Sequence, residues 1–189
     1  MSLTQSQLAR QERILEVATR LAAEGGFDAV QMRTIAVEAD VALGTLYRYF
    51  PSKEHLLVSA TLGQLGELAQ RLVLRPPMGA DPAERVLDVL RRVNATLQRE
   101  PKLTLAVLRS LTSGHETVIP AVREMRRAMR SIIIVAIGEP TIPRDELVGE
   151  VIEAVWLSAL VSWLSGVDSH ASVTRKLEDA TRLLFGDRG

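Results

Sequence analysis

The residues best suited to chemistry in this chain lie between positions 42 and 53, and the chemistry that they suit is recognition of DNA. Gly44 places no side chain between a helix backbone and a DNA groove. Thr45 offers a hydroxyl and a methyl group, which match a phosphate oxygen or a thymine methyl. Tyr47 and Arg48 are donors for phosphate or base edges, and Lys53 stands at a helix start that also favours an anion. The predicted DNA-binding set comprises Arg33, Ala42, Leu43, Gly44, Thr45, Tyr47, Arg48 and Lys53.

Two short helices joined by a tight turn would position these side chains. Apolar residues spaced for one helix face predict a helix from about Met32 to Ala39. Leu46 and Phe50, four residues apart, anchor a second helix from about Ala42 to Tyr49, which Pro51 ends. This arrangement is typical of a helix-turn-helix, whose second helix enters the major groove of DNA.

An alternative interpretation leaves the same segment without a nucleic-acid ligand. Tyr47, Tyr49 and Phe50 would then form a small aromatic core, with Arg48 and Lys53 solvated. The length and specificity of the whole pattern favour the helix-turn-helix.

The rest of the chain also has the periodicity of helices, with no alternation typical of strands. A capping box at Thr4 and Gln7 begins a first helix that ends at Gly25-Gly26. Arg75–Ala80 is the clearest break, after which Asp81 caps a new helix. Further helices are predicted over residues 53–74, 101–112, 119–137, 143–165 and 173–185.

The sequence therefore predicts an all-α fold of about nine helices, organised in two domains. Residues 1–53 would form a three-helix DNA-binding head that contains the helix-turn-helix. Residues 54–189 would form a helical domain for effector binding and dimerisation.

The composition restricts the class of protein. Lys and Arg number 23 and Asp and Glu number 23, which argues against a non-specific nucleic-acid coat protein but not against a specific reader with a local patch. Hydrophobic residues make up 47% and aromatic residues only 4%, so an aliphatic core is expected. No apolar run opens the chain, and residues 132–137 and 151–164 are too short or interrupted for a span. We expect a soluble cytoplasmic protein with no membrane partner.

The pattern of residues does not favour an enzyme or a metal site. The histidines at 55, 115 and 170 are scattered, and Ile119 stands where a His-Glu-x-x-His motif would need its second histidine. There is no cysteine, no glycine-framed serine nucleophile and no phosphate loop. We predict no catalytic residue, no cofactor and no metal ligand. A purely structural helical protein is a further alternative, which DNA binding would exclude.

The segment from Ile14 to Leu57 resembles the TetR family of bacterial transcriptional repressors. The resemblance rests on Gly25-Gly26-Phe27 after the first helix, on Ile35-Ala36, and on the run from Gly44 to Lys53. It implies DNA contacts by Thr45, Tyr47 and Lys53. Three positions depart from the family pattern, which usually has threonine, glycine and serine where this chain has Gln31, Asp40 and Ala42.

Within that family the chain is similar to the repressors of bacterial cholesterol and steroid catabolism, the KstR type. The similarity lies in Val30–Arg33, Ala39–Ala42, Val155–Ser158, Trp163-Leu164 and Arg182–Gly186. It implies release by a steroid acyl-coenzyme A thioester, and a fatty acyl-CoA is a further candidate effector. The alternative is a TetR-type regulator of a drug-efflux operon that binds planar apolar compounds.

The apolar surface after Asp81 has two candidate uses besides plain core packing. One is dimerisation, which a palindromic operator requires, and the predicted interface residues are Val151, Val155, Ser158, Ser162, Val173, Leu177, Ala180 and Leu184. The other is an effector pocket, with candidates Leu87, Leu90, Leu105, Leu108, Met125, Met129, Trp156 and Leu160. Arg123, Arg126, Arg127 and Arg130 form either a coenzyme A phosphate site or a solvated helix face. The expected partners are double-stranded operator DNA, a second copy of the chain and a small apolar effector.

Overall fold

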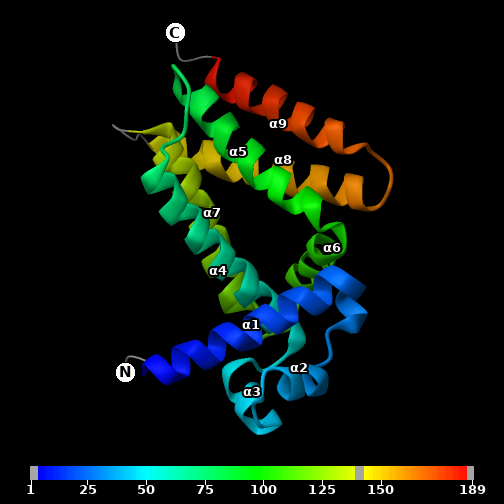
Figure 1. The fold of residues 1–189 in the computed structure, drawn as a ribbon. Helices are drawn as coiled ribbons and strands as arrows, with labels where there is room; N and C mark the ends of the chain where they lie inside the picture. The colour runs from blue at the N-terminus through cyan, green and yellow to red at the C-terminus, as the bar shows by residue number, and fades with distance from the viewer. Residues whose placement is uncertain (1–3, 139–142, 187–189) are drawn as a thin grey trace. The chain divides into compact units, whose positions relative to one another are not determined.

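A computed structural model describes residues 4–138 and 143–186 of the chain. Within these ranges the fold is all-α, with nine α-helices, one short 3-10 helix and no strand, as the sequence predicts (Figure 1). The elements in chain order are α1 (Gln5–Gly25), η1 (Phe27–Ala29), α2 (Met32–Glu38), α3 (Leu43–Tyr49), α4 (Lys53–Leu74), α5 (Pro82–Arg99), α6 (Pro101–Leu111), α7 (Ile119–Ile137), α8 (Pro143–Leu164) and α9 (His170–Phe185).

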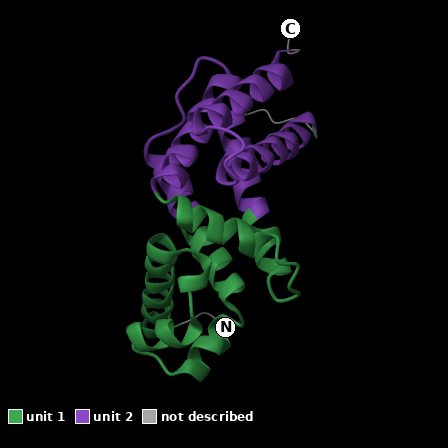
Figure 2. Ribbon diagram, turned by 90° about the vertical axis from the view of Figure 1, so that its right-hand side faces the viewer, with its two compact units in different colours: residues 1–64, 100–125 green, residues 65–99, 126–189 purple. Residues whose placement is uncertain are grey.

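The helices form two compact units, shown in different colours in Figure 2. Unit 1 holds the chain up to residue 64 together with residues 100–125, and unit 2 holds residues 65–99 and those from 126 onwards. This division differs from the predicted boundary at residue 53. Both α4 and α7 contribute residues to each unit.

The core of unit 1 explains why α6 belongs to the same body as the helix-turn-helix. Ile14 of α1, Ile35 of α2 and Leu46 of α3 are completely buried in one apolar cluster. Leu103 and Ala106 of α6 complete that cluster, although they lie some fifty residues further along the chain. Burial of aliphatic side chains is the main favourable term in folding, so α6 is held in this unit by the core itself.

Polar contacts stabilise both ends of α1. Thr4 and Gln7 form the predicted capping box, in which Thr4 N donates to Gln7 Oε1 at 2.8 Å and Gln7 N donates to Thr4 Oγ1 at 3.3 Å. At the other end Lys102 Nζ donates to the carbonyl of Glu24 at 2.8 Å. A cation there complements the negative end of the helix dipole.

Other helix ends follow local capping chemistry. Ser52 caps α4 by accepting a hydrogen bond from His55 N at 3.1 Å. Ser169 accepts from Ser172 N at 3.3 Å, so α9 begins at His170 and not at the predicted Val173. No such side-chain bond caps α2 or α3, where Gln31 and Ala42 occupy the N-cap positions.

The turn between α2 and α3 has an unusual backbone. Asp40 has φ 52°, and it is the single non-glycine residue with positive φ in the described chain. Its short polar side chain tolerates this left-handed conformation better than most residues do. The turn is closed by hydrogen bonds from Asp40 N to Val37 O at 3.2 Å and from Val41 N to Ala36 O at 2.9 Å.

In unit 2, α9 packs against both α8 and α5, as Figure 1 shows. Val173 and Leu177 of α9 are buried in this packing. Arg85 of α5 closes the end of α7, because its guanidinium donates to the carbonyls of Ala136 at 2.9 Å and Ile137 at 2.6 Å. The arginine thereby satisfies acceptors that the last turn of a helix leaves free.

Helix α8 is more apolar than the sequence interpretation allowed. By length and composition alone, Arg144–Leu164 passes as a membrane-spanning helix, and 33% of that window is buried inside the protein. One such helix is weak evidence for a membrane, because a core helix of a soluble protein passes the same criterion. What matters for this fold is that α8 carries apolar residues on more than its packed face.

The turn yields a first prediction. Asp40→Gly should raise the free energy of unfolding by about 0.5–1 kcal/mol, because glycine adopts positive φ without strain. The carboxylate of Asp40 makes no hydrogen bond to any described residue, so nothing is lost in exchange. Asp40→Ala should instead lower stability. Urea unfolding checks both variants, and a stability loss in Asp40→Gly would contradict the strained turn.

Candidate nucleic-acid interface

Helix α3 has one buried and one exposed face. Leu46 and Phe50 are buried in the core of unit 1, four residues apart as predicted. Between them Tyr47 is 47% exposed and Arg48 is also exposed. Because a helix turns by about 100° per residue, anchoring Leu46 and Phe50 inward directs Tyr47 and Arg48 outward.

The first turn of α3 is small and open. Ala42 and Gly44 are exposed, and a Cβ built on Gly44 would meet no atom within 4 Å. Thr45 is half-buried. Leu43, which is in the predicted DNA-binding set, packs partly against the core and has only part of its surface available to DNA.

The sequence left open whether the aromatic residues of α3 form a core or contact DNA, and the structure separates them. Tyr49 and Phe50 are core residues with ring centroids 6.3 Å apart, and the guanidinium of Arg48 lies 5.5 Å from the Tyr49 ring centre. Tyr47 is not part of that core. Its exposed ring and hydroxyl remain available for an external partner.

Charge pairing separates the basic residues of unit 1 into two groups. Arg20 is ion-paired with Glu24 and Glu38, and the hydrogen bond to Glu24 contributes most to raising the pKa of Arg20. Arg33 and Arg48, by contrast, make no ion pair with a described residue. The exposed positive charges beside the turn are therefore left for an outside anion, even though the whole chain is neutral.

Lys53 has a defined position at the start of α4. Its ammonium donates to the carbonyl of Phe27 at 3.3 Å and lies 3.9 Å from the centre of the Phe27 ring. Arg109 of α6 approaches the same ring at 4.1 Å and pairs with Asp28 at 3.3 Å. Lys53 itself is paired with no carboxylate of the described chain, so its charge can still serve a phosphate.

The histidines show no arrangement for catalysis or metal binding. His55 lies behind α3, 6.0 Å from the Phe50 ring, and burial lowers its pKa. His170 packs against Trp163 at 5.3 Å, and burial lowers its pKa as well. Within the described ranges no group of histidine, aspartate and glutamate has the geometry of a metal site.

The predicted effector residues are divided between the two compact units. Leu105 is 51% exposed on α6 and lies in unit 1 with Leu108 and Met125. The other five are buried in unit 2, and they are Leu87, Leu90, Met129, Trp156 and Leu160. The apolar spacing alone could not separate pocket residues from ordinary core residues.

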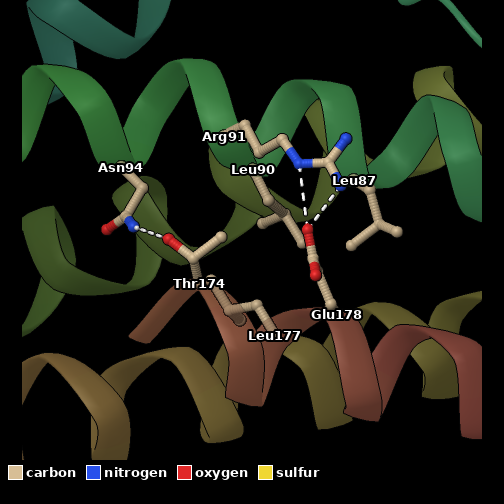
Figure 3. Close-up of a pocket in the computed structure, with 7 residues that line it drawn as sticks. All are labelled: Leu87, Leu90, Arg91, Asn94, Thr174, Leu177 and Glu178. Carbon is tan, nitrogen blue, oxygen red and sulfur yellow. Dashed lines mark hydrogen bonds and ion pairs between the residues drawn. The ribbon is translucent and has the colours of Figure 1, made fainter. Parts of the chain in front are cut away.

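Figure 3 shows how Leu87 and Leu90 lie at the junction of α5 and α9. The space that they line with Leu177 measures about 10 Å³, enough for one water molecule at most. Across it Arg91 pairs with Glu178, and Asn94 donates to Thr174 at 3.2 Å. Leu87 and Leu90 are core residues in this structure, and their contact with an effector stays a prediction.

A second hollow in unit 2 is larger, and polar and apolar residues both line it. It measures about 470 Å³ and is open to solvent between residues 78–84, α5 and Arg182. Its lining includes the carboxylates of Asp81, Glu84 and Asp88. Such a lining does not suit an apolar effector.

The predicted dimer residues require a correction on α9. Val173 is 1% exposed and Leu177 is 3% exposed, so both side chains are buried in the core of unit 2 and offer no surface to a second copy. Ala180 and Leu184 are half-buried. The predicted residues on α8 lie at or near the surface, with Val151 and Ser158 exposed and Val155 and Ser162 half-buried.

The sequence interpretation missed other apolar residues of the same surface. Leu147, Leu157 and Val161 of α8 are 59%, 43% and 50% exposed. On α9, Leu183 is 78% exposed. Their exposure depends on how α8 packs, and helix periodicity alone did not reveal it.

The arginines of α7 are partly neutralised. Arg126 pairs with Glu153 at 2.6 Å and Arg130 pairs with Glu150 at 2.9 Å, both across to α8. Arg123 and Arg127 make no ion pair with a described residue. The four arginines are thus not one free phosphate site.

Comparison with known proteins shows that two family models match this chain. Residues 14–60 match a family model described as bacterial regulatory proteins, tetR family. Residues 79–184 match a model described as the tetracyclin repressor-like C-terminal domain. The first match includes the whole helix-turn-helix, and the second includes α5 to α9.

Individual relatives agree with both models. The chain is 40% identical to the HTH-type transcriptional repressor KstR of Rhodococcus jostii RHA1 over 96% of this chain and 85% of that protein. A crystal structure of a TetR transcriptional regulator from Rhodococcus sp. RHA1 superposes with a TM-score of 0.89 at 32% identity, covering 98% of this chain and all (100%) of that one. The Thermus thermophilus FadR in complex with lauroyl-CoA shares the fold, with a TM-score of 0.65, 22% identity and 95% of each chain covered.

Proposed function

The chain belongs to the tetR family of bacterial regulatory proteins, and we propose that it is a ligand-responsive repressor that binds a palindromic operator as a dimer. A small hydrophobic effector, a steroid or an acyl-CoA thioester of lipid catabolism, releases it from DNA. Relatives in this family are regulators rather than enzymes.

The observation that carries the DNA-binding role is Gly44. Glycine in a helix costs about 0.5–1 kcal/mol relative to alanine, and no atom of the described chain lies near enough to forbid a Cβ at this position. Gly63 and Gly66 of α4 lie in equally open space, so Gly44 differs from them by its place in the exposed first turn of α3. There the missing side chain would let the α3 backbone approach a DNA groove closely.

The other residues take roles that follow from their positions. Tyr47 is exposed on α3 and Thr45 is half-buried beside it, and both would contact base edges and phosphates. Arg33, Arg48 and Lys53 carry charges without carboxylate partners among the described residues and would bind phosphates on either side of α3. Lys53 would exchange the Phe27 carbonyl for a phosphate oxygen.

A matched pair of glycine variants tests this role. Gly44→Ala and Gly63→Ala both fill open space on a helix, so each should raise stability by about 0.5–1 kcal/mol. Only Gly44→Ala should weaken binding to the DNA upstream of the protein's own gene, by at least about ten-fold, because the methyl group blocks close approach. Fluorescence anisotropy at low salt measures the affinity. Equal operator affinity of the two variants would contradict the proposal that α3 enters the DNA groove.

The dimer proposal rests on an apolar stripe of α8. Leu147, Val151, Ala154, Ser158 and Val161 follow at spacings of four and three residues, which places them on one helix face, and all are exposed. Such a face against water favours a partner helix. A second copy of the chain would bury the stripe about a two-fold axis and set two reading helices about 34–36 Å apart, as a palindrome requires.

A charge on this stripe should separate the protomers. Val161 is 50% exposed, so Val161→Glu should fold normally but place a buried charge in the interface, giving a monomer with operator affinity reduced at least about ten-fold. Val135→Glu, at a valine of α7 that is 65% exposed, is the control and should remain dimeric. Sedimentation velocity distinguishes them. A dimeric Val161→Glu variant would exclude the α8 stripe.

The effector class draws support from two sources. The chain resembles repressors of steroid catabolism, and its relative KstR is 40% identical over nearly the whole chain. A protein with the same fold, the Thermus thermophilus FadR, binds lauroyl-CoA. An effector acts only through different affinities for two poses of the protein. Helix α4 is the element that would carry this change, because it begins at Lys53 and contributes to both compact units.

Titration of the operator complex tests the effector. A steroid acyl-CoA should release the protein in the anisotropy assay, whereas free coenzyme A should not, because it lacks the apolar part. Tight operator binding unaffected by the thioester would keep the repressor and exclude this effector class.

A further inference from the structure

Two polar atoms of α8 are buried in unit 2 with no hydrogen-bond partner in the described chain. Trp156 is 6% exposed, and its indole Nε1–H has no acceptor. Glu153 uses Oε1 to accept from Arg126 Nε at 2.6 Å, but its Oε2 is buried without a donor. Buried polar groups are normally paired, so each of these atoms needs an explanation.

The two atoms lie on one face of α8. Gly149, Glu153, Trp156 and Leu160 follow at spacings of four, three and four residues and so form a single stripe. This stripe faces α7, because a Cβ on Gly149 would meet Arg130 Cγ at 3.4 Å and Ile133 Cγ2 at 3.9 Å. It is the opposite face to the apolar stripe that begins at Leu147.

One further polar atom without a partner lies on α7, the helix that this stripe faces. Arg130 Nε is buried with no acceptor in the described chain, and the Cγ of the same side chain lies against Gly149. Leu160 of the same stripe and Met129 of α7 are both buried. The negative charge of Glu153 is already balanced by Arg126. A ligand group at this place therefore needs no charge of its own, but it must offer an acceptor to Trp156 Nε1–H and a donor to Glu153 Oε2.

We propose that Trp156 and Glu153 form a subsite for an alcohol group on the apolar effector. A hydroxyl accepts a hydrogen bond from Trp156 Nε1–H and donates its own proton to Glu153 Oε2, so both buried atoms become paired. A ketone pairs with Trp156 alone, and a hydrocarbon pairs with neither. A ligand carboxylate brings no donor and meets the charge of Glu153. This inference rests on the proposed effector-responsive function and names the chemistry by which the effector is recognised.

Three steroids that differ at one carbon test the preference. Calorimetric titration uses 5α-androstan-3β-ol, 5α-androstan-3-one and 5α-androstane, each delivered as a cyclodextrin complex to the full-length protein. The alcohol should bind at least about ten-fold more tightly than the hydrocarbon, with the ketone between them, because unpaired buried polar groups penalise the analogue that lacks the matching atoms. Equal binding of the alcohol and the hydrocarbon, or no binding of any of the three, would overturn the subsite.

Two tryptophan variants assign the preference to the correct side chain. Trp156→Phe keeps an aromatic ring but removes the N–H, so it should reduce the alcohol preference to about three-fold or less while hydrocarbon binding stays. Trp163→Phe, the matched change at the other tryptophan, should keep the full preference. A full preference in Trp156→Phe, or its loss in Trp163→Phe, would overturn the assignment.

Operator binding without any steroid keeps this inference separate from the proposed function. If the protein binds its operator but shows no alcohol preference, the subsite fails and the repressor stands. If the protein does not bind operator DNA, the proposed function fails, and an alcohol preference that depends on Trp156 still supports the subsite.

Discussion

The burial of Leu46 and Phe50 in the core of unit 1 is the constraint on which the DNA-binding surface depends. The two side chains fix not only the position of α3 but also its rotation about its own axis. Once they point inward, helical geometry directs Tyr47 and Arg48 to the solvent. The same core holds α6 through Leu103 and Ala106, so a distant segment of the chain supports the helix that would read DNA.

Helix α8 shows a second constraint, because its two faces serve different purposes. The stripe from Gly149 to Leu160 is turned toward α7, and the stripe from Leu147 to Val161 is exposed. An apolar residue on either face gives the same signal in the sequence. This explains how a helix of one unit can pass a composition criterion for a membrane span while only 33% of that window is buried.

The basic residues of unit 1 differ in whether a carboxylate pairs with them. The chain has equal numbers of acidic and basic residues, and a net charge near zero gives no general attraction to DNA. The structure resolves this by pairing. Arg20 and Arg109 are neutralised by carboxylates, whereas Arg33 and Arg48 beside the helix-turn-helix are not paired within the described chain. The net charge of the chain therefore does not reveal which of its basic residues lack an internal partner.

The sequence by itself determined the helices and the chemistry of the α3 surface, because these depend on neighbours along the chain. The ends of α4 and α7, the capping box at Thr4 and the turn at Asp40 follow from local hydrogen bonding and backbone sterics. Tertiary structure decided which apolar residues face the core and which face outward. Val173 and Leu177 proved to be buried and Leu147 and Val161 exposed, and the buried unpaired oxygen of Glu153 had no signal in the sequence. Apolar periodicity marks a face but not its partner, because core, interface and ligand all favour the same side chains and only packing distinguishes them.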